Sequence, residues 1–131
     1  MPLVRVSLRK GKSDDYKRAI GDGVYKAMRE AFNIPEEDRF VVVSEHSESE
    51  FQFSKTYLDI ARSDDLVIIQ ITANNTRTVE QKKALFARIA ELLSVSPGLR
   101  KEDVFISLVD VPKENWSFGN GEAQYVSEQP K

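Results

Sequence analysis

The chain has 131 residues, of which 40% are hydrophobic and 31% charged, and its formal net charge is −2. This length fits one domain, and the near balance of charge argues against a protein that binds nucleic acid or an anionic membrane. The absence of cysteine excludes disulfides and thiolate chemistry, and a single histidine, His46, argues against a histidine-built metal site.

The first 46 residues predict a strand, a helix and a second strand. Residues 3–8 alternate apolar and polar side chains, which is typical of a strand with one buried face. Residues 13–32 place apolar side chains at helical spacing behind Ser13, a favourable N-cap. Pro35 ends this helix because the residue before a proline avoids helical backbone angles. Residues 39–46, RFVVVSEH, then predict a strand.

Two glycines lie inside the first predicted helix. Gly21 and Gly23 each weaken a helix by about 1 kcal/mol relative to alanine, so their presence calls for a physical reason. We expect another element of the fold to come close to the helix at both positions.

The second half repeats this order after an irregular connector, residues 47–64. The apolar run DLVIIQITA, residues 65–73, predicts a strand that is buried on both faces. Residues 78–95 form an amphipathic helical pattern with Thr78 as N-cap, and residues 102–111 predict a fourth strand.

The two halves align without a gap at a shift of 65 residues, which favours an internal repeat of residues 1–46 and 66–111 followed by a tail, residues 112–131. The chain is thus expected to be one α/β (α+β) domain of two tandem β-α-β units. The units would share one four-stranded sheet with both helices on one face. The other face of that sheet would be uncovered and apolar in a monomer, so we expect an oligomer.

Proline directly follows the initiator methionine, and the first predicted strand begins at once. Removal of Met1 would leave Pro2 with a free secondary amine. An α-amine has an ordinary pKa of about 7.7–8.0, and burial lowers it by penalising the charged form. Pro2 is therefore a candidate general base or acid at the end of a rigid strand.

The start MPLVRVSL, the two β-α-β halves and the absence of cysteine resemble the tautomerase superfamily, which uses an amino-terminal proline. The segments NIPEEDRFVVVSEH and ENWSFGNGEAQY are similar to the malonate semialdehyde decarboxylase-like branch. That branch has a Pro-x-x-Asp-Arg-aromatic segment and a Trp-Ser-Phe-Gly-x-Gly-x-Ala-Gln tail. The resemblance covers nearly the whole chain and implies a homotrimer.

The resemblance also implies roles for particular residues. It implies catalytic roles for Pro2 and Asp38, and substrate contacts for Arg77, Asn75, Trp116, Phe118 and Tyr125. Asn75 lies where the branch has the first of two arginines that hold a carboxylate. A single arginine cannot form that clamp, which weighs against decarboxylation of a β-keto acid. Without the resemblance, Arg77 and Asp38 are an ordinary loop arginine and turn aspartate.

Three functions follow as alternatives. The first is a tautomerase-like enzyme in which Pro2 transfers a proton on a small enolisable keto acid that carries a carboxylate. The second is a malonate semialdehyde decarboxylase- or hydratase-like activity with Pro2 as the acid and Asp38 acting on water. The third is a non-catalytic oligomeric binding protein, since fold does not imply function. We expect no cofactor, no metal and no nucleic-acid or membrane partner. No signal peptide or membrane span is visible, so we expect a cytoplasmic protein.

Overall fold

The computed structural model of the chain describes residues 2–126. Its elements are, in chain order, β1 (Leu3–Arg9), α1 (Asp14–Phe32), β2 (Val41–His46), β3 (Val67–Asn74), α2 (Val79–Val95) and β4 (Val104–Val111). Three one-turn 3₁₀ helices lie in the connecting segments, and a fourth lies in the tail after β4. Within the described range no helix combines the length and the apolar character that crossing a membrane requires.

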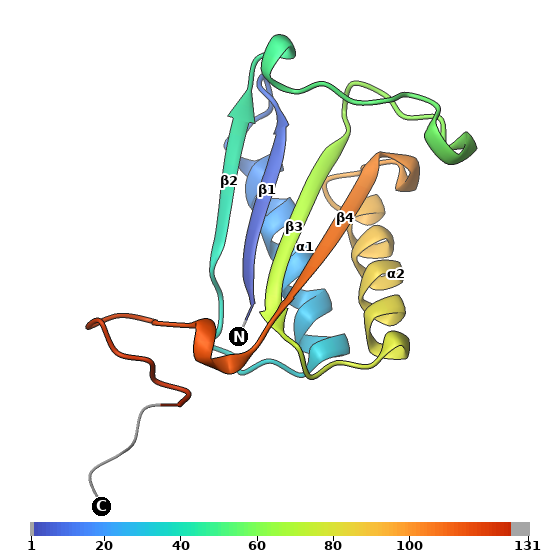
Figure 1. The fold of residues 1–131 in the computed structure, drawn as a ribbon. Helices are drawn as coiled ribbons and strands as arrows, with labels where there is room; N and C mark the ends of the chain where they lie inside the picture. Colours follow the sequence, from blue (N-terminus) through green and yellow to red (C-terminus); the bar gives the residue numbers. More distant parts are fainter. Residues whose placement is uncertain (1, 127–131) are drawn as a thin grey trace, which may run out of the picture.

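The four strands form one mixed sheet in the order β2-β1-β3-β4. Each half of the chain pairs its own strands in parallel, β1 with β2 and β3 with β4, and the halves meet where β1 and β3 run antiparallel. Both helices cover the same face of the sheet (Figure 1). The predicted fold class is confirmed by this arrangement.

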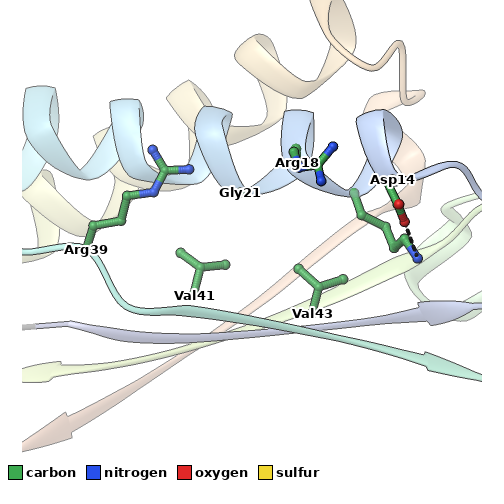
Figure 2. Close-up of a pocket in the computed structure, with 7 residues that line it drawn as sticks. Asp14, Arg18, Gly21, Arg39, Val41 and Val43 are labelled. Atoms are coloured by element: carbon green, nitrogen blue, oxygen red, sulfur yellow. Dashed lines mark ion pairs between the residues drawn. The ribbon is translucent and has the colours of Figure 1, made fainter.

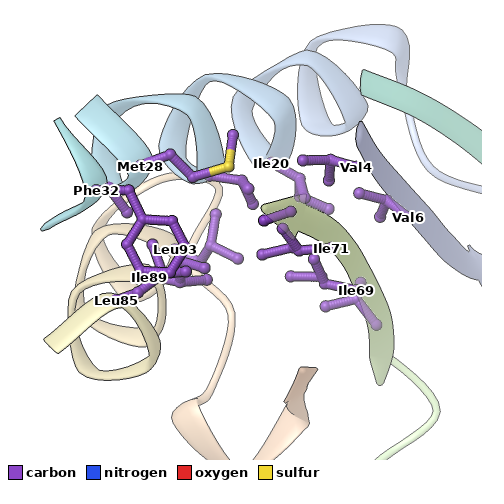
Figure 3. Packing of buried hydrophobic residues seen from close by; sticks show 14 of the residues in the cluster. Val4, Val6, Ile20, Met28, Phe32, Ile69, Ile71, Leu85, Ile89 and Leu93 are labelled. Carbon is purple, nitrogen blue, oxygen red and sulfur yellow. The ribbon is translucent and has the colours of Figure 1, made fainter. Parts of the chain in front are cut away.

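The core lies between that face and the two helices (Figure 3). Alternate residues of the central strands point into it, because successive side chains of a strand face opposite sides of the sheet. The side chains that meet there are at most 2% exposed: Val4, Val6, Leu8, Ile69 and Ile71 from the sheet and Ile20, Val24, Met28, Leu85, Ile89 and Leu93 from the helices. Burying each large side chain contributes roughly 1.5–3 kcal/mol.

No helix within residues 2–126 covers the opposite side of the sheet, here called the open face. It carries the other alternate residues: Leu3, Arg5, Ser7, Val42, Ser44, Ile68, Gln70, Thr72, Phe105, Ser107 and Val109. The prediction that residues 65–73 are buried on both faces is wrong for the single chain, since β3 presents Gln70 to solvent. The open face is polar in its middle, and its exposed large apolar residues lie on the two edge strands: Val42 on β2, and Phe105 and Val109 on β4.

The two halves begin their helices 65 residues apart, at Asp14 and Val79. The same offset carries Asp38 onto Asp103, but Asp103 is buried. Its two carboxylate oxygens accept hydrogen bonds from the backbone N–H and the hydroxyl of Ser63, at 2.7 and 2.6 Å. In the second half this carboxylate therefore anchors the connector to the start of β4.

The close approach expected at the helix glycines is confirmed at one of them. A Cβ atom on Gly23 would lie 2.8 Å from Cδ2 of Leu93, so this glycine lets α1 and α2 come together. At Gly21 the nearest atom to such a Cβ is Cγ1 of Val41, at 3.6 Å, which is ordinary van der Waals contact. Only Gly23 is required by packing.

The two glycines give a matched test of helix packing. Gly21→Ala should stabilise the protein by about 0.5–1 kcal/mol, because alanine costs less backbone entropy in a helix and the methyl group has room. Gly23→Ala should destabilise it, because overpacking a core costs roughly 1–3 kcal/mol and exceeds the gain in propensity. Urea unfolding of both variants measures the difference. Equal effects of the two substitutions would contradict this account of the helix contact.

Candidate active site

A cavity of about 240 Å³ opens at the amino-terminal end of β1. Its lining consists of Pro2, Leu3, Phe40, Trp116, Ser117 and Phe118. Pro2 is buried, and the Val4 backbone N–H donates a 2.9 Å hydrogen bond to the Phe40 carbonyl, which holds the start of β1 against the end of the α1–β2 loop. The first strand thus places the proline ring in an apolar, aromatic surrounding.

The aromatic wall of this cavity is built by the tail that follows β4. The Trp116 and Phe118 rings stack with centroids 5.4 Å apart, and Tyr125 packs edge-on against Phe118 at 4.9 Å. The Trp116 indole N–H donates to the side-chain oxygen of Asn74 at 2.8 Å. Three aromatic rings are therefore joined to each other and tied to the end of β3.

A tight loop keeps this tail in place. Gly119, Asn120 and Gly121 all have positive φ angles, so the chain turns sharply there and the two glycines meet that need without strain. Gln124 spans the turn: its side-chain oxygen accepts from the Phe118 N–H at 2.9 Å, and its side-chain nitrogen donates to the Gly119 carbonyl at 2.7 Å. Gln124 thereby holds Phe118 in the wall.

Asp38 lies on the loop that leads to Phe40. Burial raises the pKa of the Asp38 carboxyl above its ordinary value, and the positive charges at the chain's amino terminus and on Arg77 act in the opposite direction. The positive charge of Arg77 therefore acts on the Asp38 carboxyl, although Asp38 does not line the cavity itself.

Arg77 lies directly before Thr78, the N-cap of α2, and its guanidinium reaches back to the end of α1. It donates to the Phe32 carbonyl at 3.2 Å and stands over the Phe32 ring at 4.7 Å. Arg77 therefore carries a structural contact as well as positive charge. Asn75 is exposed, its backbone N–H donates to the Val111 carbonyl, and neither residue lines the cavity.

A larger groove of about 590 Å³ runs between α1 and the edge strand β2 (Figure 2). Val41 and Val43 form its floor, and Arg39 and Arg18 lie along its sides. Its cations are already partnered by acids: Lys17 contacts Asp14 and Glu45, and Arg39 contacts Asp22. Since these charged side chains of the groove are already engaged in ion pairs, and the smaller cavity contains the buried Pro2, the smaller cavity is the better candidate.

The structure thus brings three of the predicted site residues into one cavity, Pro2, Trp116 and Phe118, with Tyr125 packed behind them. Residue-level reasoning missed three others. Phe40 is the aromatic position of the Asp-Arg-aromatic segment, and Gln124 is the last residue of the tail motif. Both could therefore have been predicted from the motifs in the sequence. Asn74 could not, because its role depends on a residue 42 positions away.

Two sequence models described as "Tautomerase enzyme" match the chain, one over residues 38–119 and the other over residues 2–59. The curated protein "Probable tautomerase YusQ" of Bacillus subtilis (strain 168) is 42% identical over 96% of this chain and 99% of its own length. This chain therefore belongs to the tautomerase family.

Solved structures show which members of this family the chain resembles in fold and sequence. FG41 malonate semialdehyde decarboxylase, inhibited by 3-bromopropiolate, is 38% identical with a TM-score of 0.88, over 95% of this chain and 94% of the other. A second malonate semialdehyde decarboxylase, described with decarboxylase and hydratase activities, is 30% identical with a TM-score of 0.89 over 95% of both chains. A fused 4-OT symmetric trimer, 21% identical with a TM-score of 0.78, covers 96% of this chain and 99% of its own and shares the fold.

The raised pKa of Asp38 makes stability depend on pH. Folding disfavours the ionised form of Asp38, so ionisation of this carboxyl lowers the free energy of unfolding. This loss of stability is absent below the unfolded pKa of about 3.9, grows as pH rises through the folded pKa, and is complete above it. Asp38→Asn should therefore raise Tm at pH 7 and leave Tm unchanged near pH 3.5. Differential scanning calorimetry at both pH values measures this, with the exposed neighbour Glu37→Gln as control. The same Tm difference at both pH values would contradict the assignment.

Proposed function

We propose that this chain is a tautomerase for a small enolisable keto acid, with the Pro2 amine as the group that moves the proton once Met1 is removed. The observation that supports this most is the buried position of Pro2 in an aromatic cavity at a rigid strand end. Burial in such surroundings lowers the pKa of an amine, and a base with a pKa near the working pH is the most effective catalyst.

The proposed step conserves protons. In the keto-to-enol direction the Pro2 nitrogen accepts a proton from the carbon next to the carbonyl, the electrons of that C–H bond form the C=C bond, and the electrons of the C=O π bond move onto the oxygen. The protonated Pro2 amine then gives its proton to that oxygen and returns to the neutral form. The reverse sequence gives the keto form. A positioned group of this kind accelerates proton transfer by roughly 10²–10⁴-fold.

Positive charge near the cavity supports an acidic substrate. Arg77 lies at the N-terminus of α2, where helix dipoles favour anions, and its charge is felt at Asp38. We assign Arg77 to the substrate carboxylate and to the charge on the enolate oxygen. Asp38 faces the same charges and would hold the protonated Pro2 amine in place.

Decarboxylation or hydration of a β-keto acid is the second candidate, because two malonate semialdehyde decarboxylases share 30% and 38% of their residues with this chain. In that reaction Pro2 would act as the acid and Asp38 would position water. We rank it second because Asn75 replaces one of the two arginines of that branch and is exposed outside the cavity. Faster release of CO₂ from malonate semialdehyde than ketonisation of any enol would reverse the ranking.

The Pro2 amine is tested by three forms of the protein whose masses are first verified by intact mass spectrometry. Relative to the processed protein, Pro2→Ala should ketonise phenylenolpyruvate about tenfold more slowly, since it keeps a primary and less constrained amine. A form that keeps Met1 should lose about 10²–10⁴-fold, because its Pro2 nitrogen is part of a peptide bond. Equal rates in all three forms would remove Pro2 from the reaction, and rates no faster than the uncatalysed reaction would make a non-catalytic binding protein the better interpretation.

We also propose that the chain forms a homotrimer through the open face. The apolar residues Val42, Phe105 and Val109 on that face are 37–46% exposed in the single chain, and the fused 4-OT neighbour with the same fold is a symmetric trimer. Exposed apolar area of this kind on a sheet favours association.

Sedimentation velocity at micromolar concentration should therefore give a mass about three times that of the 14.9 kDa chain. Phe105→Lys, on the open face, should shift the protein toward monomer. Val95→Lys, at the 81% exposed end of α2, should not. A monomeric mass for the unmodified protein would remove the trimer from the proposal.

A further inference from the structure

Asn74, the last residue of β3, is unusual in being a buried polar side chain, with 6% of its surface exposed. A buried amide is costly unless it is hydrogen-bonded, and its oxygen accepts from the Trp116 indole N–H at 2.8 Å. The indole nitrogen can only donate, so the oxygen of Asn74 is the atom that must face it. The bond therefore fixes the orientation of both side chains.

Asn74 is the contact that joins the Trp116 ring to the sheet. The tail leaves β4 after Val111, and a turn in which the Asn115 N–H donates to the Pro112 carbonyl carries it to Trp116. These backbone contacts place the Trp116 Cα atom and do not themselves set the orientation of its side chain. The stacking partner Phe118 belongs to the same tail, so it cannot fix the ring relative to Pro2.

We propose that Asn74 is a positioning residue of the site: it holds the Trp116 indole against the cavity, where the ring contacts the apolar end of the keto acid. This role in substrate binding rests on the proposed function, whereas the contact between the Asn74 and Trp116 side chains does not. Asn74 touches no reacting atom in this assignment, and its effect on catalysis passes through the position of Trp116.

A spectroscopic experiment tests the position of the ring without turnover. Trp116 is the chain's single tryptophan, so indole fluorescence reports on this ring alone. Asn74→Leu removes the acceptor at similar volume and should shift the emission to the red and increase quenching by acrylamide. Asn115→Ala, an exposed asparagine next to Trp116 in the chain, should change neither. Unchanged emission and quenching in Asn74→Leu would overturn the inference.

Kinetics then separate positioning from a loss of stability. Asn74→Leu should raise KM for phenylenolpyruvate roughly fivefold, the equivalent of one hydrogen bond, and change kcat by less than about twofold. The enol of a four-carbon keto diacid lacks the aromatic ring and should be affected less. In the Trp116→Phe background, which lacks the donor, Asn74→Leu should have no further effect on KM. Equal losses for both substrates, or additive effects of the two substitutions, would indicate a merely structural residue.

A conservative variant covers the case in which Asn74→Leu folds poorly. Asn74→Asp keeps an oxygen acceptor at the same place and should restore the fluorescence and the KM of the unmodified protein. Failure to restore either would count against the hydrogen bond as the cause. If Asn74→Leu changes the fluorescence as expected but the unmodified protein does not ketonise phenylenolpyruvate, the proposed function is refuted. The contact between Asn74 and Trp116 would then still be established.

Discussion

The register of β1 is the constraint on which the other features depend. This strand is central, paired with β2 on one side and β3 on the other, and Val4, Val6 and Leu8 are almost completely buried under the helices. A slip of one residue would turn all three toward the open face and expose the core. Because the core fixes the register, it also fixes where Pro2 lies, one residue before the strand begins. Hydrophobic packing thus determines where the Pro2 end of the cavity lies.

Arg77 and Asp38, two charged residues proposed for the site, lie on loops that follow the ends of β3 and α1. Arg77 joins the start of α2 to the end of α1 through the Phe32 carbonyl, and its charge reaches Asp38 on the loop after α1. Helix packing and site electrostatics are therefore coupled at this arginine. Its replacement would loosen the meeting of two helix ends and would remove positive charge from the neighbourhood of Asp38.

Local patterns predicted the elements well because alternation and helical spacing follow directly from which face is buried. They placed α1 behind Ser13 and α2 behind Thr78, and both caps accept hydrogen bonds in the structure. The same patterns overstated the burial of β3, where an apolar run does not reveal that Gln70 faces solvent. The aromatic wall depended on contacts between distant residues. No spacing rule links Asn74 to Trp116, and the direction of a tail rich in glycine is not encoded in periodicity.

The 65-residue offset between the halves has a consequence for stoichiometry. At the place that Pro2 takes before β1, the second half has Val67, whose nitrogen belongs to an internal peptide bond and cannot act as a base. A chain made of two similar units therefore has one terminal amine, and a trimer would have three reactive centres for six units. Under the proposed function the second unit takes no part in proton transfer through an amine, and its carboxylate at Asp103 anchors the connector.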